Sequence, residues 1–92
     1  MTGLENLHGR HLENPFLVLA LPPSATGAEI ERAGQRLLAM LTADLEEARR
    51  YTTPFGTRAR TPELVRAAMA ELRDPDRRLV AEWWARGWQG AP

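Results

Sequence analysis

The sequence contains no cysteine, which excludes disulfides, thiolate chemistry and cysteine-ligated metal sites. It also lacks lysine, and all 12 basic residues are arginines, so Schiff-base catalysis is excluded. Twelve acidic residues balance them to zero net charge, whereas a dedicated nucleic-acid binder usually carries a basic excess. No apolar run approaches the ~18 residues of a membrane span, and the N-terminus lacks a secretory pattern. We therefore expect a cytoplasmic protein with neither a nucleic-acid nor a membrane partner.

Side chains that commonly carry catalysis or bind metals are also scarce. Ser24 is the only serine, and it lies where a helix is expected to start. His8 and His11 are the only histidines, and they have too few neighbouring carboxylates for a metal site of defined geometry. No glycine-rich phosphate loop is present. We predict a non-enzymatic protein that uses no metal and no other cofactor.

The 92 residues, 43% of them hydrophobic, suit one small domain with a single modest core. Asn14 and Pro15 are a favourable N-cap and first helical residue. They predict a short helix over 15–20, which Pro22 and Pro23 would end because neither has an N–H.

A second helix start follows at Thr26, whose spacing to Glu29 is that of a capping box. Apolar residues then recur every three or four positions, and no proline interrupts them before Pro54. This pattern predicts one long helix over 27–51. Its apolar stripe would contain Ile30, Ala33, Leu37, Leu41, Leu45 and Ala48.

Residues 52–60 contain proline and glycine and predict a loop. Thr61 and Pro62 start a third helix, over 62–73, and the Asp74–Pro75–Asp76 break starts a fourth. The apolar residues placed on and around the apolar face of that helix are Leu79, Val80, Trp83, Trp84 and Trp88. With no period-two alternation recognised, we predict an all-α domain over 14–88, between an N-terminal extension (1–13) and a C-terminal tail (89–92).

This order of helices resembles the J domain of DnaJ-type co-chaperones. The segment from Asn14 to Pro22 is similar to the opening of that family, and Ser24 to Leu37 to the start of its second helix. Leu72, Asp74–Pro75 and Arg77–Arg78 are similar to its closing Leu-x-Asp-Pro-x-x-Arg motif. The resemblance covers about 14–84 and implies a small bundle: a short first helix, long antiparallel second and third helices, and a short fourth.

The family acts through a His-Pro-Asp tripeptide that docks on a DnaK-type chaperone and stimulates ATP hydrolysis. Here that position reads Thr42, Ala43 and Asp44, so only the aspartate remains. Because alanine favours a helix and the apolar stripe continues beyond it, we expect an unbroken helix with Asp44 on its side. Among the positions that match the family's chaperone-facing cations, Arg36 alone is basic; Glu31 and Gln35 are not.

Several residues allow two interpretations. Trp83, Trp84 and Trp88 either cap the core above the first helix or anchor a partner, since adjacent helical residues point about 100° apart. Gly34, inside the second helix, is either tolerated there or marks the close approach of another helix. Arg58 and Arg60 are either solvated loop charges or a grip for an anionic group.

Arg77 and Arg78 are expected to pair locally with Asp74.

From the residues and the resemblance together, the predicted function is a J-domain-like protein–protein interaction module that has lost the ATPase-stimulating motif. The alternative is a divergent co-chaperone or decoy that still contacts a DnaK-type ATPase. The partner is another protein in both cases, and the oligomeric state is open.

Overall fold

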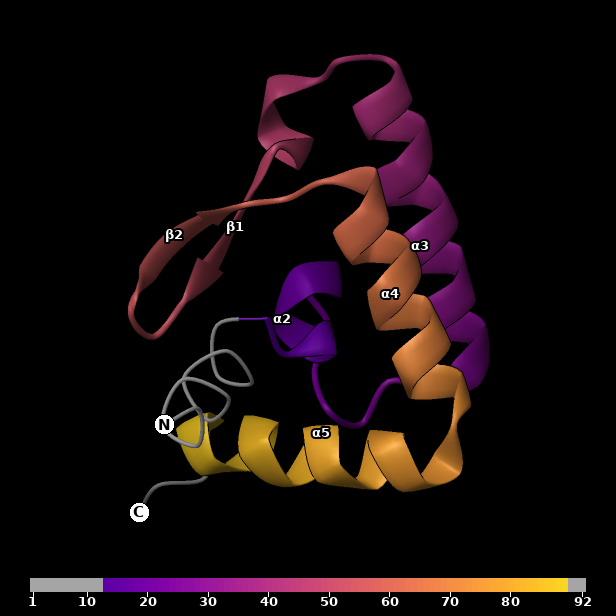
Figure 1. The fold of residues 1–92 in the computed structure, drawn as a ribbon, viewed down its shortest axis with the longest axis vertical. Helices are drawn as coiled ribbons and strands as arrows, with labels where there is room; N and C mark the ends of the chain where they lie inside the picture. Colours follow the sequence, from indigo (N-terminus) through magenta and orange to yellow (C-terminus); the bar gives the residue numbers. More distant parts are fainter. Residues whose placement is uncertain (1–12, 90–92) are drawn as a thin grey trace, which may run out of the picture.

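The computed structural model describes residues 13–89, with side chains to position 86, and the described chain is mostly helical (Figure 1). In chain order its elements are α2 (Pro15–Leu19), α3 (Gly27–Thr42), the 3-10 helix η1 (Glu46–Ala48), β1 (Arg50–Thr53), β2 (Gly56–Ala59), α4 (Pro62–Arg73) and α5 (Pro75–Gln89). Helices α3 and α4 run antiparallel side by side, and α2 packs on α4. Helix α5 crosses one end of this group. No helix within the described residues has the length and apolarity to cross a bilayer.

The helix starts follow the capping residues of the sequence. The side chain of Asn14 accepts a hydrogen bond from the backbone N–H of Phe16 at 2.9 Å. At the start of α3, the Thr26 hydroxyl accepts from the Glu29 N–H at 3.1 Å, and the Glu29 carboxylate accepts from the Thr26 N–H at 2.8 Å. This reciprocal pair satisfies two N–H groups that have no partner inside the helix. The predicted starts of both helices are confirmed.

The predicted end of the helix over 27–51 is wrong, because α3 ends at Thr42. Asp44 adopts a left-handed backbone with φ of 63°. Its N–H donates to the carbonyl of Leu41, and the N–H of Leu45 donates to the carbonyl of Met40. These two bonds form a Schellman motif, which satisfies the last carbonyls of a helix. Aspartate tolerates the left-handed conformation better than most residues, so the helix ends here without glycine or proline.

The predicted loop over 52–60 is also wrong, since this segment completes a β-hairpin and the described chain is not all-α. Strands β1 and β2 pair antiparallel, with Arg50 opposite Ala59 and Thr53 opposite Gly56. The Thr53 hydroxyl accepts from the Phe55 N–H at 3.0 Å and donates to the Gly56 carbonyl at 2.8 Å. These bonds hold the two-residue turn.

The core lies between α2, α3, α4 and α5, with Tyr51 entering it from the hairpin. Its buried apolar residues are Phe16, Val18, Leu19, Ala25, Ile30, Tyr51, Val65, Ala68, Met69, Leu72, Ala81 and Ala85. Gly34 is buried where α3 meets α4, and a Cβ built on it would lie 2.2 Å from the sulfur of Met69. Of the two interpretations of this glycine, close approach of a helix is therefore correct, and the helix belongs to the same chain.

Replacing Gly34 tests this packing. We expect Gly34→Ala to lower the free energy of unfolding by about 1 kcal/mol: the flexible Met69 side chain moves aside, but it is itself buried, so its displacement outweighs the gain in helix propensity. Gly27→Ala is the matched control, because its Cβ would meet nothing within 4 Å; we expect it to be neutral or to stabilise by up to about 1 kcal/mol. Urea denaturation followed by circular dichroism measures both. Equal stability of the two variants would contradict the close approach.

Candidate interaction surface

The break between α4 and α5 sets the start of α5. The Asp74 carboxylate accepts from the backbone N–H groups of Asp76 at 3.0 Å and Arg77 at 3.2 Å, and Pro75 occupies the first helical position. Asp74 is therefore the N-cap of α5, and its acceptors are used by the backbone. We expected the side chains of Arg77 and Arg78 to pair with this carboxylate, but neither does so among the described contacts.

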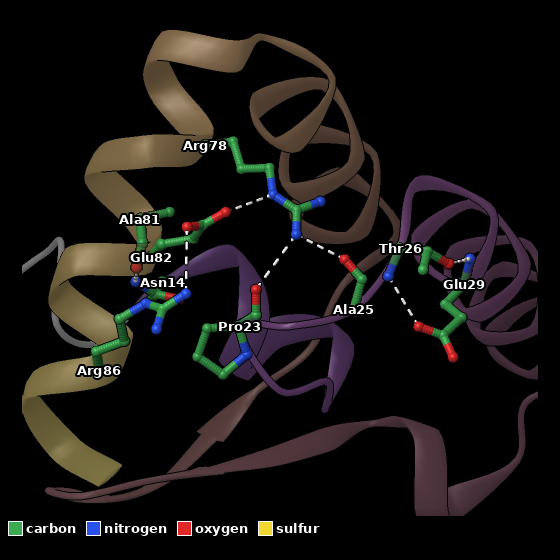
Figure 2. A network of polar contacts seen from close by, with 9 residues as sticks. All are labelled: Asn14, Pro23, Ala25, Thr26, Glu29, Arg78, Ala81, Glu82 and Arg86. Carbon is green, nitrogen blue, oxygen red and sulfur yellow. Dashed lines mark hydrogen bonds and ion pairs between the residues drawn. The ribbon is translucent and has the colours of Figure 1, made fainter. Parts of the chain in front are cut away.

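Arg78 instead ties α5 to the segment that leads into α3 (Figure 2). Its guanidinium donates to the carbonyls of Pro23 at 3.2 Å and Ala25 at 2.6 Å. It also pairs with the Glu82 carboxylate at 2.7 Å. One turn beyond Arg78, the side-chain amide of buried Asn14 donates to the Ala81 carbonyl at 3.0 Å. We call these contacts the Arg78 network.

The Arg78 network fixes which side of α5 faces inward. Ala81 and Ala85 are each 2% exposed and form the packed side, where their small side chains let α5 lie close to α2. Leu79, Val80 and Trp83 are 66%, 43% and 69% exposed. These three apolar residues of the predicted apolar face therefore lie at the surface and not on the packed side of the helix. Together they form a side that we call the outer face of α5.

The two described tryptophan side chains differ in their surroundings. Trp83 and Trp84 meet edge to face, with ring centroids 5.0 Å apart and an interplanar angle of 83°. Trp84 is half-buried, whereas Trp83 is exposed. The core-cap interpretation therefore does not hold for Trp83, and this residue fits the interpretation as an anchor. Trp88 lies within α5, but its side chain falls outside the described part of the chain.

Charged residues stand at both ends of the outer face of α5. Asp76 is exposed in the first turn of the helix. Arg86 is exposed in the last turn and lies 3.6 Å from the Glu82 carboxylate. Because Glu82 also accepts from Arg78, Arg86 shares its partner. The outer face thus has an apolar centre, an acid at one end and a base at the other.

The turn after α3 is a second exposed feature. Thr42, Ala43 and Asp44 are all exposed, and the Asp44 carboxylate forms an ion pair with Arg49. This contact raises the pKa of Arg49, chiefly through the hydrogen bond to Asp44. Asp44 therefore lies on a turn and not on the side of a helix, contrary to the expectation from the sequence.

The arginines singled out in the sequence have three different surroundings. Arg36 is exposed on α3. Arg58 is exposed on β2, and a side-chain hydrogen bond joins it to Tyr51. Arg60 is only 7% exposed, so neither of its interpretations, a solvated loop charge or a grip for a partner's anionic group, fits its place.

Arg60 joins three elements of the fold. It donates to the carbonyl of Val18 at 2.8 Å and to that of Ala48 at 3.2 Å, and its guanidinium lies 5.7 Å from the centre of the Tyr51 ring. Burial lowers the pKa of Arg60. The guanidinium thus attaches the hairpin and η1 to α2.

A groove of about 460 Å³ lies between the end of α2 and the hairpin, and Leu21, Glu47 and Tyr51 are among its lining residues. Within residues 13–86, no three His, Asp or Glu side chains are grouped so as to hold a metal ion. The histidines at positions 8 and 11 lie outside the described residues.

Removing the Arg60 guanidinium tests its structural role. We expect Arg60→Met to lower the free energy of unfolding by about 2–4 kcal/mol, since two bonds to a charged donor are lost and buried carbonyls are left without them. Arg66→Met is the matched control on the exposed side of α4 and should change stability by less than about 0.5 kcal/mol. Equilibrium unfolding in urea measures both changes. A similar effect of the two variants would contradict the assignment.

Comparison with known proteins gives no relative of this chain. Neither family models nor curated proteins nor solved structures give a match to the chain. Function must therefore be argued from the two exposed features described above, the outer face of α5 and the turn at Asp44.

Proposed function

We propose that this chain is a non-enzymatic, J-domain-like protein-interaction module whose docking surface is the outer face of α5. One observation carries the proposal: Leu79, Val80 and Trp83 are exposed together on a helix whose opposite side is tied to the core. Tryptophan is among the residues that contribute most to binding energy at protein interfaces. Grouped exposed apolar side chains are typical of such sites.

The physical basis of binding on this face is burial of apolar surface. Full burial of a large apolar side chain contributes about 1.5–3 kcal/mol, and the surface includes one aromatic and two aliphatic residues. The Arg78 network holds α5 in one orientation before a partner arrives. Docking then orders few additional groups, which keeps the entropic cost of association low.

The J-domain-like part of the proposal rests on the order of the helices. A short helix precedes two longer antiparallel helices, and a further helix follows an Asp-Pro break. The hairpin between α3 and α4, and the 15-residue length of α5, depart from the bundle that the resemblance implies. The proposed mechanism is placement of a partner protein and involves no reaction chemistry.

Site-specific photocrosslinking in the native cell tests the module. A benzophenone amino acid replacing Leu79 should form covalent adducts with protein, because this position lies at the centre of the proposed contact. The same amino acid replacing exposed Ala67 on α4 is the matched control and should give at least about tenfold less adduct, as expected of a residue outside the docking surface.

Adding Trp83→Glu to the Leu79 crosslinking variant should remove its adducts, since a charge would then stand in the apolar contact. Circular dichroism of the purified variant checks that it is folded. Absence of protein adducts at position 79, or equal yields at positions 79 and 67, would contradict the proposed function.

A second candidate function, contact with a DnaK-type chaperone, is favoured by the turn at Asp44. The matching position in the J-domain family presents an aspartate after the second helix, and here Asp44 follows the last residue of α3 by two positions and is exposed. The Schellman motif supplies the helix end that a proline supplies in the family. The missing histidine and proline weigh against this candidate.

Asp44→Gly and Asp44→Ala together test the second candidate. Both remove the carboxylate, but glycine suits the φ of 63° and alanine does not, so Asp44→Ala should be less stable by about 1 kcal/mol. If the carboxylate acts on a chaperone, both variants should lose stimulation of the ATPase activity of a DnaK-type protein from the same source. Stimulation that persists in both, or that the wild-type chain never produces, rejects this candidate.

A further inference from the structure

The charged and apolar residues of the outer face of α5 are arranged so that two copies of the helix, lying antiparallel, would bring opposite charges together. Asp76 lies five residues before Ala81, and Arg86 lies five residues after it. Leu79 and Trp83 lie two residues on either side of the same position. Reversing the helix about Ala81 therefore exchanges the acid with the base and one apolar residue with the other.

These residues lie on one side of the helix as well as in a symmetric order. At about 100° per residue, Asp76, Val80 and Trp83 fall within an arc of about 60°. Leu79 and Arg86 flank that arc on one side, and Ala81 and Ala85 lie opposite to it, where they are buried. With a rise of about 1.5 Å per residue, the acid and the base are about 15 Å apart along the axis.

We propose that a second copy of this chain covers the outer face of α5, with the two α5 helices antiparallel across a two-fold axis that passes between the two outer faces at the level of Ala81 along the helix. The proposal rests on the proposed function and names the partner at its docking surface. In this dimer Leu79 packs on Trp83 of the second copy. Asp76 pairs with Arg86 of the second copy, and the symmetry repeats both contacts.

The charges needed for these pairs are accessible. Asp76 is exposed, and the carboxylate that caps the helix is that of Asp74. Among the described residues, Arg86 pairs with Glu82 alone, at 3.6 Å, and Glu82 keeps its 2.7 Å contact with Arg78 when Arg86 turns to another acid. Forming the intermolecular pairs therefore leaves the Arg78 network intact.

In a two-fold dimer the same surface of both copies is in contact, so the residues at one end of the surface must complement those at the other end. Binding to an unrelated protein would not require the charged and apolar residues of α5 to be arranged in this way. A face of one helix is smaller than the ~800 Å² per partner of a standard interface. We therefore expect a dimer with Kd on the order of micromolar, in equilibrium with the monomer.

Sedimentation equilibrium of the purified full chain tests the dimer. The average mass should rise from monomer to dimer with concentration, and Trp83→Glu should raise Kd by at least about tenfold, because it places a charge in the apolar centre. Leu45→Glu is the matched control: Leu45 is also an exposed leucine, and it belongs to the segment between α3 and η1, which lies at the end of the molecule opposite α5 (Figure 1). This variant should leave Kd unchanged.

Reversing the charges tests the antiparallel arrangement. Asp76→Arg and Arg86→Asp should each weaken self-association by about tenfold, because like charges then face each other in both symmetric positions. An equimolar mixture of the two variants should associate about as well as the wild-type chain, since both pairs are opposite in charge in the mixed dimer. Circular dichroism melting checks that each variant is folded. The mixture of the two charge variants tests the antiparallel arrangement even if Trp83→Glu fails to fold.

Two results would overturn the proposal. A wild-type chain that remains monomeric to millimolar concentration excludes the dimer. A wild-type dimer whose charge variants do not recover in the mixture excludes the antiparallel contact. If position 79 forms photoadducts with another protein while the chain stays monomeric, the interaction module stands and the dimer fails; absence of all adducts contradicts the module itself.

Discussion

The side of α5 that faces solvent is decided by hydrogen bonds more than by hydrophobicity. The Arg78 network ties the helix to Pro23, Ala25 and Asn14. Turning α5 to bury Trp83 would break these contacts, so the guanidinium would lose its two carbonyl partners and the buried amide of Asn14 would lose the Ala81 carbonyl. A buried polar group without its partner costs about 1–3 kcal/mol, and more when it is charged. This penalty opposes the gain from burying one more large apolar residue.

Small residues occupy the closest helix contacts, which leaves larger apolar residues for the surface. Gly34 admits Met69 between α3 and α4, and Ala81 and Ala85 form the packed side of α5. A leucine or tryptophan at these alanines would hold α5 away from α2 and lengthen the bonds of the Arg78 network. Close packing and the polar contacts therefore require each other. The exposed position of Leu79, Val80 and Trp83 follows from both.

Sequence patterns predicted where helices begin, but not where α3 ends or which side of α5 is packed. Caps at Asn14 and Thr26 are local, so a few residues determine them. The end of α3 depends on Asp44 in a left-handed conformation that glycine commonly supplies. On α5, apolar residues surround most of the helix, so periodicity alone could not choose a side. The strands have four residues each, too few for their alternation to stand out from a loop.

The turn that follows α3 and the helix α5 lie at opposite ends of the molecule (Figure 1). A second copy on α5 would therefore leave both turns of the dimer accessible, and a contact at the turn would leave α5 free to pair. The turn forms with threonine and alanine at positions 42 and 43, because the Schellman motif ends α3 there. Pairing through α5 would place two such turns on one particle, so two weak contacts at the turns would reinforce each other through avidity when both can be engaged at once.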